Sequence, residues 1–176
     1  NNIVEVIDKI KDTASSHERT FIIEVMGRGS GYLALVSAIA TGAEAAIIPE
    51  VEFDLEKIAN RILERYKRNK AANIIVVAEG ASTAYQIGRK LSRIASIESK
   101  ITVLGHLQRG GSPSSFDRLL GTRLGSAAVS ELLQNKSNCM VGLVKGKVET
   151  TPLDVVLKKR KAFNKKFIEL AEMLGN

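Results

Sequence analysis

The sequence predicts an α/β fold, a three-layer sandwich with a mostly parallel sheet and helices on both faces. Its strand-like runs are short and continuously apolar, as in strands that are buried on both faces. These runs alternate with amphipathic stretches of helical length, which is the pattern of βαβ units. Glycine and polar residues gather directly after the runs, where an open α/β sheet places its ligands.

Apolar spacing and end signals define the elements of the first part of the chain. Ile3, Ile7 and Ile10 recur at helical spacing. Gly42 suits the left-handed position after a helix, Pro49 stops a strand, and Asp54 is a typical N-cap. These signals predict a helix at 3–12, a strand at 20–25, a helix at 31–41, a strand at 45–48 and a helix from Asp54 to about Asn69.

The alternation continues in the second part of the chain. The apolar run 73–78 predicts a strand and residues 82–95 predict a helix. The β-branched run 101–104 predicts a parallel strand, which we expect to be buried. A helix at 116–134, a strand at 140–144 with a turn at Gly146, and one or two helices after Pro152 complete the prediction.

Composition restricts the class of protein. The 176 residues are 44% hydrophobic and 26% charged, which is ordinary for one globular domain or two small lobes. No stretch reaches the roughly 18 apolar residues of a membrane helix, and the N-terminus does not read as a signal peptide. The single Cys139 cannot form an intrachain disulfide. We therefore expect a cytoplasmic protein without a membrane partner.

The net charge of +7 has two interpretations. A basic surface can bind nucleic acid, but the aromatic content is only 5% and no nucleic-acid-binding module is recognisable. The densest basic runs, Lys158–Lys161 and Lys165–Lys166, fit the solvated face of a terminal helix. The remaining cations lie near glycine-rich loops, which favours a small phosphate and not a nucleic acid.

Two of the segments that follow predicted strands admit both a structural and a functional interpretation. The glycines of Glu24–Gly31 match neither a dinucleotide-binding motif nor a P-loop. That segment is a tight strand-to-helix turn, or a loop whose amides and Arg28 face an anion. Glu79 caps the next helix near its positive end, or accepts hydrogen bonds from sugar hydroxyls.

The third segment, 105–118, is the most informative. It offers an imidazole, a carboxamide, two guanidiniums and flexible glycine backbone. Because the carboxyl ends of parallel strands meet at one edge, we expect Met26–Arg28, Glu79, His106 and Arg109 to lie together. A carboxylate for hydroxyls beside several cations for phosphate indicates a sugar phosphate as the ligand.

Four motifs resemble those of the bacterial-type 6-phosphofructokinases, in that family's order and spacing. They are Ser16–Arg19, Glu24–Arg28, Pro49–Phe53 and Gly105–Pro113. The resemblance covers nearly the whole chain. It implies a phosphofructokinase-like fold with a Rossmann-like lobe, and phosphoryl transfer from ATP to the 1-hydroxyl of fructose 6-phosphate in glycolysis.

The resemblance is to the C-terminal half of that family. The glycine-rich nucleotide loop and the Thr-x-Asp-Asn-Asp motif of the N-terminal half do not occur in this sequence. Residues 1–107 are thus expected to form the fructose 6-phosphate lobe. Residues 108–176 are expected to help complete the nucleotide lobe and to pack on the sugar lobe. We expect such a chain alone to bind substrate only weakly and to be inactive, with the main Mg²⁺ ligands in the other half.

The family's functional residues carry over by position. Arg28 matches the arginine that stabilises charge on the transferring phosphoryl group. The family positions that bind the sugar phosphate within one subunit correspond to Met26, Gly27, Glu79, His106 and Arg109. The positions that reach this site from a neighbouring subunit correspond to Arg19 and Lys100. Lys100 stands where an arginine is usual, which keeps the charge but loses the forked geometry. Two interpretations stay open: the lysine changes the affinity for phosphate, or it is tolerated in place of the arginine.

An effector site is a further implication of the resemblance. It would bind a nucleoside diphosphate or phosphoenolpyruvate between subunits. The matching positions are Lys11, Glu44, Arg68 and Lys70, with Glu44 acting through Mg²⁺. Without the family context, the basic residues among them indicate only a solvated helix end.

Three alternatives stay open at this point. The donor is ATP or pyrophosphate, and the Ala78–Ala81 version of the glutamate motif resembles the pyrophosphate or mixed branch. A sugar-phosphate or nucleotide sensor without catalysis is another class, and a non-catalytic partner subunit is a third. The family implies a homotetramer, and a chain of this length could form a dimer.

Overall fold

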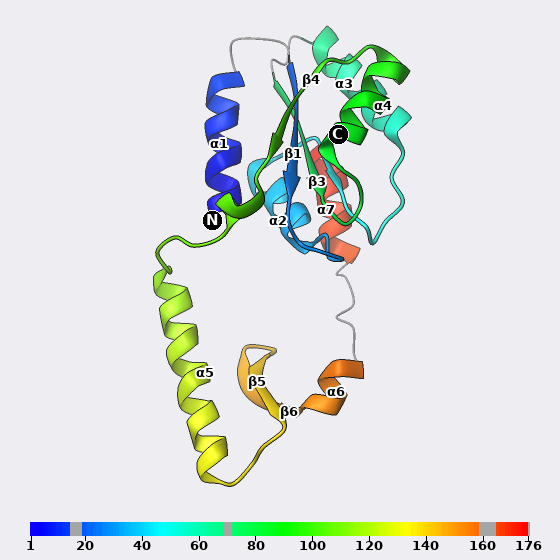
Figure 1. Ribbon diagram of the computed structural model, residues 1–176. Helices are drawn as coiled ribbons and strands as arrows, with labels where there is room; N and C mark the ends of the chain where they lie inside the picture. Colours follow the sequence, from blue (N-terminus) through cyan, green and yellow to red (C-terminus); the bar gives the residue numbers. More distant parts are fainter. Residues whose placement is uncertain (15–18, 69–71, 159–164, 176) are drawn as a thin grey trace. The chain divides into compact units, whose positions relative to one another are not determined.

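A four-stranded parallel sheet forms the core of the larger part of the structure, which is a computed structural model (Figure 1). It describes residues 1–14, 19–68, 72–158 and 165–175. The spatial strand order is β2 (Ala45–Ile47), β3 (Ala72–Ala78), β1 (Arg19–Val25) and β4 (Ser99–Val103). All three strand pairs are parallel, so the predicted fold class is confirmed.

Helices cover both faces of this sheet. One face packs against α1 (Asn2–Ala14), α2 (Tyr32–Thr41) and α7 (Lys165–Gly175), and the other against α3 (Leu55–Lys67) and α4 (Ala84–Ala95). Neighbouring residues of β1 and β3 point to opposite faces because side chains alternate along a strand. Thus Ile23 belongs to the first core and Ile22 to the second, and both are fully buried.

The predicted helix ends are confirmed where their signals were specific. Asp54 Oδ1 accepts hydrogen bonds from the backbone nitrogens of Glu56 (2.9 Å) and Lys57 (3.1 Å) at the start of α3. Gly42 has a φ of 60° and ends α2. The helix predicted from residue 82 begins at Ala84, because Thr83 forms a capping box with Gln86.

The prediction that the strand after residue 100 is buried is wrong. In the part of the chain that the structure describes, β4 is an edge strand that pairs with β1 alone, and the side chain of Val103 is 47% exposed. An apolar run indicates a strand but does not indicate its position within a sheet. The edge position leaves one side of β4 without a neighbouring strand.

The chain divides into two compact units, which are residues 1–110 with 163–176, and residues 111–162. The second unit holds α5 (Ser115–Leu133), β5 (Cys139–Val144), β6 (Lys147–Pro152) and α6 (Leu153–Lys158). β5 and β6 form an antiparallel hairpin. β6 was not predicted, since its sequence Lys-Val-Glu-Thr-Thr-Pro is mostly polar. Among residues 111–158, which the structure describes, no side chain is buried.

The basic runs near the C-terminus are described only in part. Lys158 ends α6, and Lys165 and Lys166 begin α7. The rest of the predicted basic helix face lies outside the described residues. Within the described ranges, no helix has both the length and the apolar character needed to span a bilayer.

Shortening a side chain at the centre of the sheet should be far more damaging than the same change on the surface. Ile22→Ala removes a fully buried side chain and should lower the free energy of unfolding by about 2–5 kcal/mol. Ile94→Ala in α4, where the side chain is 47% exposed, should cost less than about 1 kcal/mol. Urea unfolding followed by circular dichroism measures both, and equal losses would contradict the burial described here.

Candidate functional site

Three loops meet at the carboxyl edge of the sheet. They follow β1, β3 and β4 and begin at Met26, Glu79 and Leu104. Backbone hydrogen bonds continue one residue beyond the paired strands. Glu79 N donates to Val25 O (2.9 Å) after β3, and Leu104 N donates to Glu24 O (3.1 Å) after β4. The structure therefore brings together the residues that the sequence assigned to the sugar site within one chain.

Glu79 binds the backbone of the loop after β1. Its Oε1 accepts hydrogen bonds from Gly27 N (3.1 Å) and Arg28 N (2.8 Å). These two bonds lower the pKa of the Glu79 carboxyl, and the charges of Arg28 and Arg109 lower it further. The helix-capping interpretation of Glu79 is wrong, since Thr83 and Gln86 cap α4.

The loops after β1 and β3 approach each other very closely. A Cβ on Gly80 would lie 2.1 Å from the carbonyl oxygen of Arg28, so only glycine fits there. Arg28 itself has a φ of 52°, a left-handed conformation that costs energy for a residue with a side chain. The bond from its N–H to Glu79 helps to hold this conformation, which leaves the exposed guanidinium at the sheet edge.

Two more carboxylates bind the first amides of helices at this edge. Both oxygens of Glu50 accept from Gly31 N at the start of α2 (2.9 and 3.1 Å). Glu24 Oε2 accepts from Ala84 N at the start of α4 (2.8 Å). Of the loop whose amides and Arg28 were expected to face an anion, the amides of Gly27, Arg28 and Gly31 are therefore already occupied. They bind carboxylates of the protein, whereas the guanidinium of Arg28 is exposed.

The loop after β4 presents two exposed cationic or titratable side chains, His106 and Arg109. It is tied to the loop after β1 by Gln108, whose Oε1 accepts from Met26 N (2.7 Å) and whose Nε2 donates to Met26 O (3.4 Å). The sequence indicated a carboxamide in this loop but assigned no role to Gln108. Its position beside Arg109 in the loop after a strand was the available signal.

Arg19 and Lys100 lie toward the opposite end of the sheet. Arg19 starts β1, seven residues before Met26, which corresponds to about 23 Å of extended chain. Lys100 pairs with Phe21 near the start of β4 and is exposed. The structure thus separates these two positions from the carboxyl-edge residues.

Glu44 lies in a buried ion-pair network at the start of β2. It is 7% exposed, and its Oε1 lies 2.6 Å from Arg65 Nη2 while its Oε2 accepts from Ile74 N. Burial raises the pKa of the Glu44 carboxyl, against the opposing effects of the Ile74 amide, Arg65 and Lys11. Lys11 also donates to Thr41 O, so the structure brings Lys11 and Glu44 near each other.

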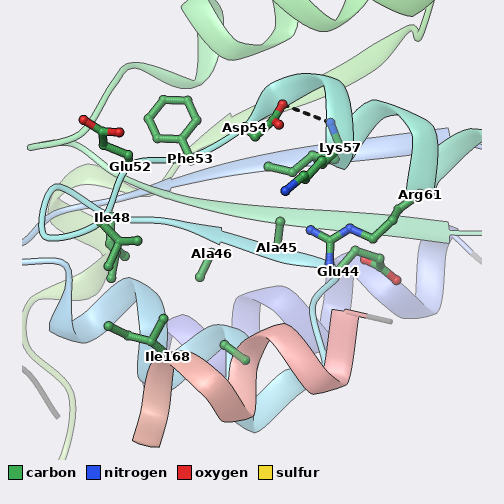
Figure 2. Close-up of a pocket in the computed structure, with 13 residues that line it drawn as sticks. Glu44, Ala45, Ala46, Ile48, Glu52, Phe53, Asp54, Lys57, Arg61 and Ile168 are labelled. Atoms are coloured by element: carbon green, nitrogen blue, oxygen red, sulfur yellow. Dashed lines mark hydrogen bonds between the residues drawn. The ribbon is translucent and has the colours of Figure 1, made fainter. Parts of the chain in front are cut away.

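Figure 2 shows the surroundings of Glu44. A pocket beside β2 is lined by Glu44, by Lys57 and Arg61 from α3, and by Ile168 from α7. Arg68 is exposed and ends α3, and Lys70 lies outside the described residues. The described ranges contain no group of three or more His, Cys, Asp or Glu side chains that could hold a metal ion.

Comparison with known proteins decides the family. The phosphofructokinase family model, described as Phosphofructokinase, matches residues 1–132. The chain belongs to the phosphofructokinase family. It is 48% identical over 175 residues to the ATP-dependent 6-phosphofructokinase of Thermotoga neapolitana, and 44% identical over 175 residues to that of Clostridium acetobutylicum. Both alignments cover 99% of this chain and 55% of the relative, so the chain spans about half the length of these phosphofructokinases.

Solved phosphofructokinase structures agree with the fold. The structure of the Saccharomyces cerevisiae enzyme matches with a TM-score of 0.82 and 31% identity, over 98% of this chain and 24% of that one. The pyrophosphate-dependent phosphofructokinase of Marinobacter aquaeolei matches with a TM-score of 0.76 over 93% of this chain and 46% of that one. At 23% identity, this second match supports the fold alone.

A methyl group on Gly80 should disrupt the edge of the sheet. In Gly80→Ala the new Cβ would overlap the Arg28 carbonyl, so we expect a loss of about 1–3 kcal/mol in the free energy of unfolding. Gly29→Ala is the matched control, because a Cβ there meets no atom within 4 Å, and it should change stability by less than about 0.5 kcal/mol. Urea unfolding compares them, and an unchanged Gly80→Ala stability would refute the close approach.

Glu79 should stabilise the fold at neutral pH and lose this effect in acid. Its pKa is lowered in the folded state, so its contribution is complete above the ordinary value of 4.5 and disappears as the pH falls through the folded value. The difference in unfolding free energy between wild type and Glu79→Gln should therefore shrink below that pH. Urea unfolding over a pH series tests this, and a difference independent of pH would count against it.

Proposed function

We propose that this chain forms the sugar-phosphate-binding part of a 6-phosphofructokinase, which transfers a phosphoryl group from ATP to the 1-hydroxyl of fructose 6-phosphate. The observation that carries the proposal is the carboxyl edge of the sheet. There a fixed carboxylate, Glu79, lies among the exposed side chains of Arg28, His106 and Arg109. A sugar phosphate needs both an acceptor for its hydroxyls and cations for its phosphate.

Each residue has a role that its contacts support. The amides of Gly27 and Arg28 hold Oε1 of Glu79, so we assign Oε2 to the sugar hydroxyls. Arg109 and His106 would bind the 6-phosphate, and Met26 and Gly27 would lie beside the sugar. Arg28 would stabilise the charge on the transferring phosphoryl group, because positioning and electrostatics dominate this chemistry.

ATP is the proposed donor. Relatives at 42–50% identity are named ATP-dependent, whereas the pyrophosphate-dependent structure is much less similar. Mg²⁺ is usual in phosphoryl transfer, but the described residues do not fit a resident ion. We expect the chain alone to bind substrate without phosphoryl transfer.

We also propose that the site is shared between copies of the chain. Arg19 and Lys100 match sugar-phosphate positions but lie toward the other end of the sheet, beyond the reach of their own chain's edge. They would serve the site of a neighbouring subunit, as expected for a homotetramer. The exposed position of Lys100 on an edge strand suits such a role.

Residues 108–176 would help complete a nucleotide lobe, and within them residues 111–162 form the second compact unit. No side chain of this unit is buried among those described, although Phe116, Leu119, Leu132 and Leu133 are large and apolar. Exposed apolar side chains on this scale indicate a surface that another segment covers. We propose that the covering segment is the nucleotide-binding half of the family, and that 1–107 is the sugar lobe.

Glu44, Lys11 and Arg68 are the described members of a proposed effector site, and the family position Lys70 completes it. The support is the proximity of Lys11 to Glu44 and the exposed position of Arg68 at the end of α3. A Mg²⁺ ion at Glu44 would compete with Arg65 and the Ile74 amide. Cytoplasmic function in glycolysis is part of the same proposal.

Calorimetric titration with fructose 6-phosphate tests the main proposal. We expect saturable binding that fructose does not reproduce and that Arg109→Ala abolishes. Arg93→Ala, which removes an exposed arginine from the end of α4, is the matched control and should bind like wild type. No binding in a chain shown to be folded, or equal binding of fructose, would overturn the proposal.

A further inference from the structure

We infer that Gln108 positions the phosphate-binding side chains of this site by joining the loop after β4 to the main chain of Met26. The inference rests on the proposed function for its consequence in binding. Its structural basis is independent of that function, since it depends only on contacts between the two loops.

Gln108 continues the pairing of β1 with β4 beyond the end of the strands. The last paired residues are Glu24 and Val103, and Leu104 N still donates to Glu24 O. The chain then turns away, with Gly105 at a φ of 48°. Gln108 returns and binds both the N–H and the C=O of Met26. A carboxamide can do this because, like a peptide group, it carries a donor and an acceptor.

The other side of the same loop is held by the N-terminal helix. Asn2 Nδ2 donates to Gly110 O (3.1 Å) and to Gln108 O (3.5 Å), and Arg109 N donates to His106 O (3.0 Å). The peptide group before Arg109 and the carbonyl of Gly110 after it are thus held. These bonds use main-chain and carboxamide groups, so they hold the backbone without engaging the guanidinium.

The consequence is a fixed spacing between two parts of the site. Met26, bound by Gln108, directly precedes the Gly27 and Arg28 amides that bind Glu79. Gln108 therefore connects the loop of His106 and Arg109 to the loop of Arg28 and Glu79. In the proposed site these loops bind opposite ends of one sugar phosphate. The role of Gln108 is positioning, because its side chain binds backbone and not the ligand.

The first test follows the electrostatic effect of Arg109 on Glu79, without any ligand. Arg109 is one of the charges that lower the pKa of Glu79, after the two backbone bonds and together with Arg28. Gln108→Met keeps the length of the side chain but removes both hydrogen bonds, so Arg109 should move away and the pKa of Glu79 should rise. NMR titration of the Glu79 carboxyl detects this shift. In an Arg109→Met background, Gln108→Met should raise this pKa less than it does in wild type.

The second test measures binding of fructose 6-phosphate by calorimetry. Loss of two hydrogen bonds that fix the loop should weaken binding by about tenfold or more. Gln108→Glu keeps the acceptor for Met26 N but loses the donor to Met26 O and adds a negative charge, so it should also bind more weakly. Gln134→Met, at the exposed end of α5, is the matched control and should bind like wild type.

The outcomes separate the two proposals. An unchanged pKa of Glu79 in Gln108→Met would overturn the positioning role, whether or not the sugar phosphate binds. If wild type binds no fructose 6-phosphate but the pKa rises in the variant, the proposed function fails and the positioning of Arg109 stands. Should Gln108→Met not fold, Gln108→Asn, which is uncharged and one methylene too short to reach Met26 in the same way, carries the pKa test, with the wild-type urea midpoint as its reference for folding.

Discussion

The site depends on carboxylates that bind main-chain N–H groups at the carboxyl edge of the sheet. Glu79 holds the loop after β1, Glu50 holds the start of α2, and Glu24 holds the start of α4. Amides at such positions are natural anion sites, because their dipoles favour negative charge. Here the protein supplies the anions itself. In the proposed site, phosphate recognition would rest on the exposed side chains of Arg28, His106 and Arg109.

This arrangement separates the two kinds of polar recognition that a sugar phosphate requires. Backbone amides orient a carboxylate, and the oriented carboxylate is left with acceptor capacity for hydroxyl groups. The cations come from two different loops, so their spacing depends on how those loops are joined. Gln108 and Gly80 both act at this junction, the first through hydrogen bonds and the second by allowing contact between backbones.

Much of the fold could be predicted because burial and helix ends leave local signals. The continuous apolar run of β3 and the caps Asp54 and Gly42 are examples. Sheet order leaves no such signal, so the exposure of β4 was not foreseen. The mostly polar β6 shows no apolar run to mark a strand. At the site, residue type and position after a strand identified Glu79 and Arg109. The partner of Glu79 and the role of Gln108 depend on contacts between segments far apart in the sequence.

A side chain also binds the main chain of a neighbouring strand at the amino end of the sheet, as the Gln108 side chain binds the loop after β1 at the carboxyl end. Glu44 N donates to Ile74 O (2.9 Å), and the Glu44 carboxylate accepts from Ile74 N, so this residue closes the pairing of β2 with β3. Arg65 joins the closure from α3, with Nη2 beside Glu44 and Nε donating to Asn73 Oδ1 (2.9 Å). A buried charge of this kind is stable only while its partner is present. A cation bound at Glu44 would have to displace one of these bonds, and would thereby loosen the junction of α3, β2 and β3. β3 runs from this junction to Glu79, so the buried ion pair at one end of the strand and the bound carboxylate at the other belong to the same central strand of the sheet.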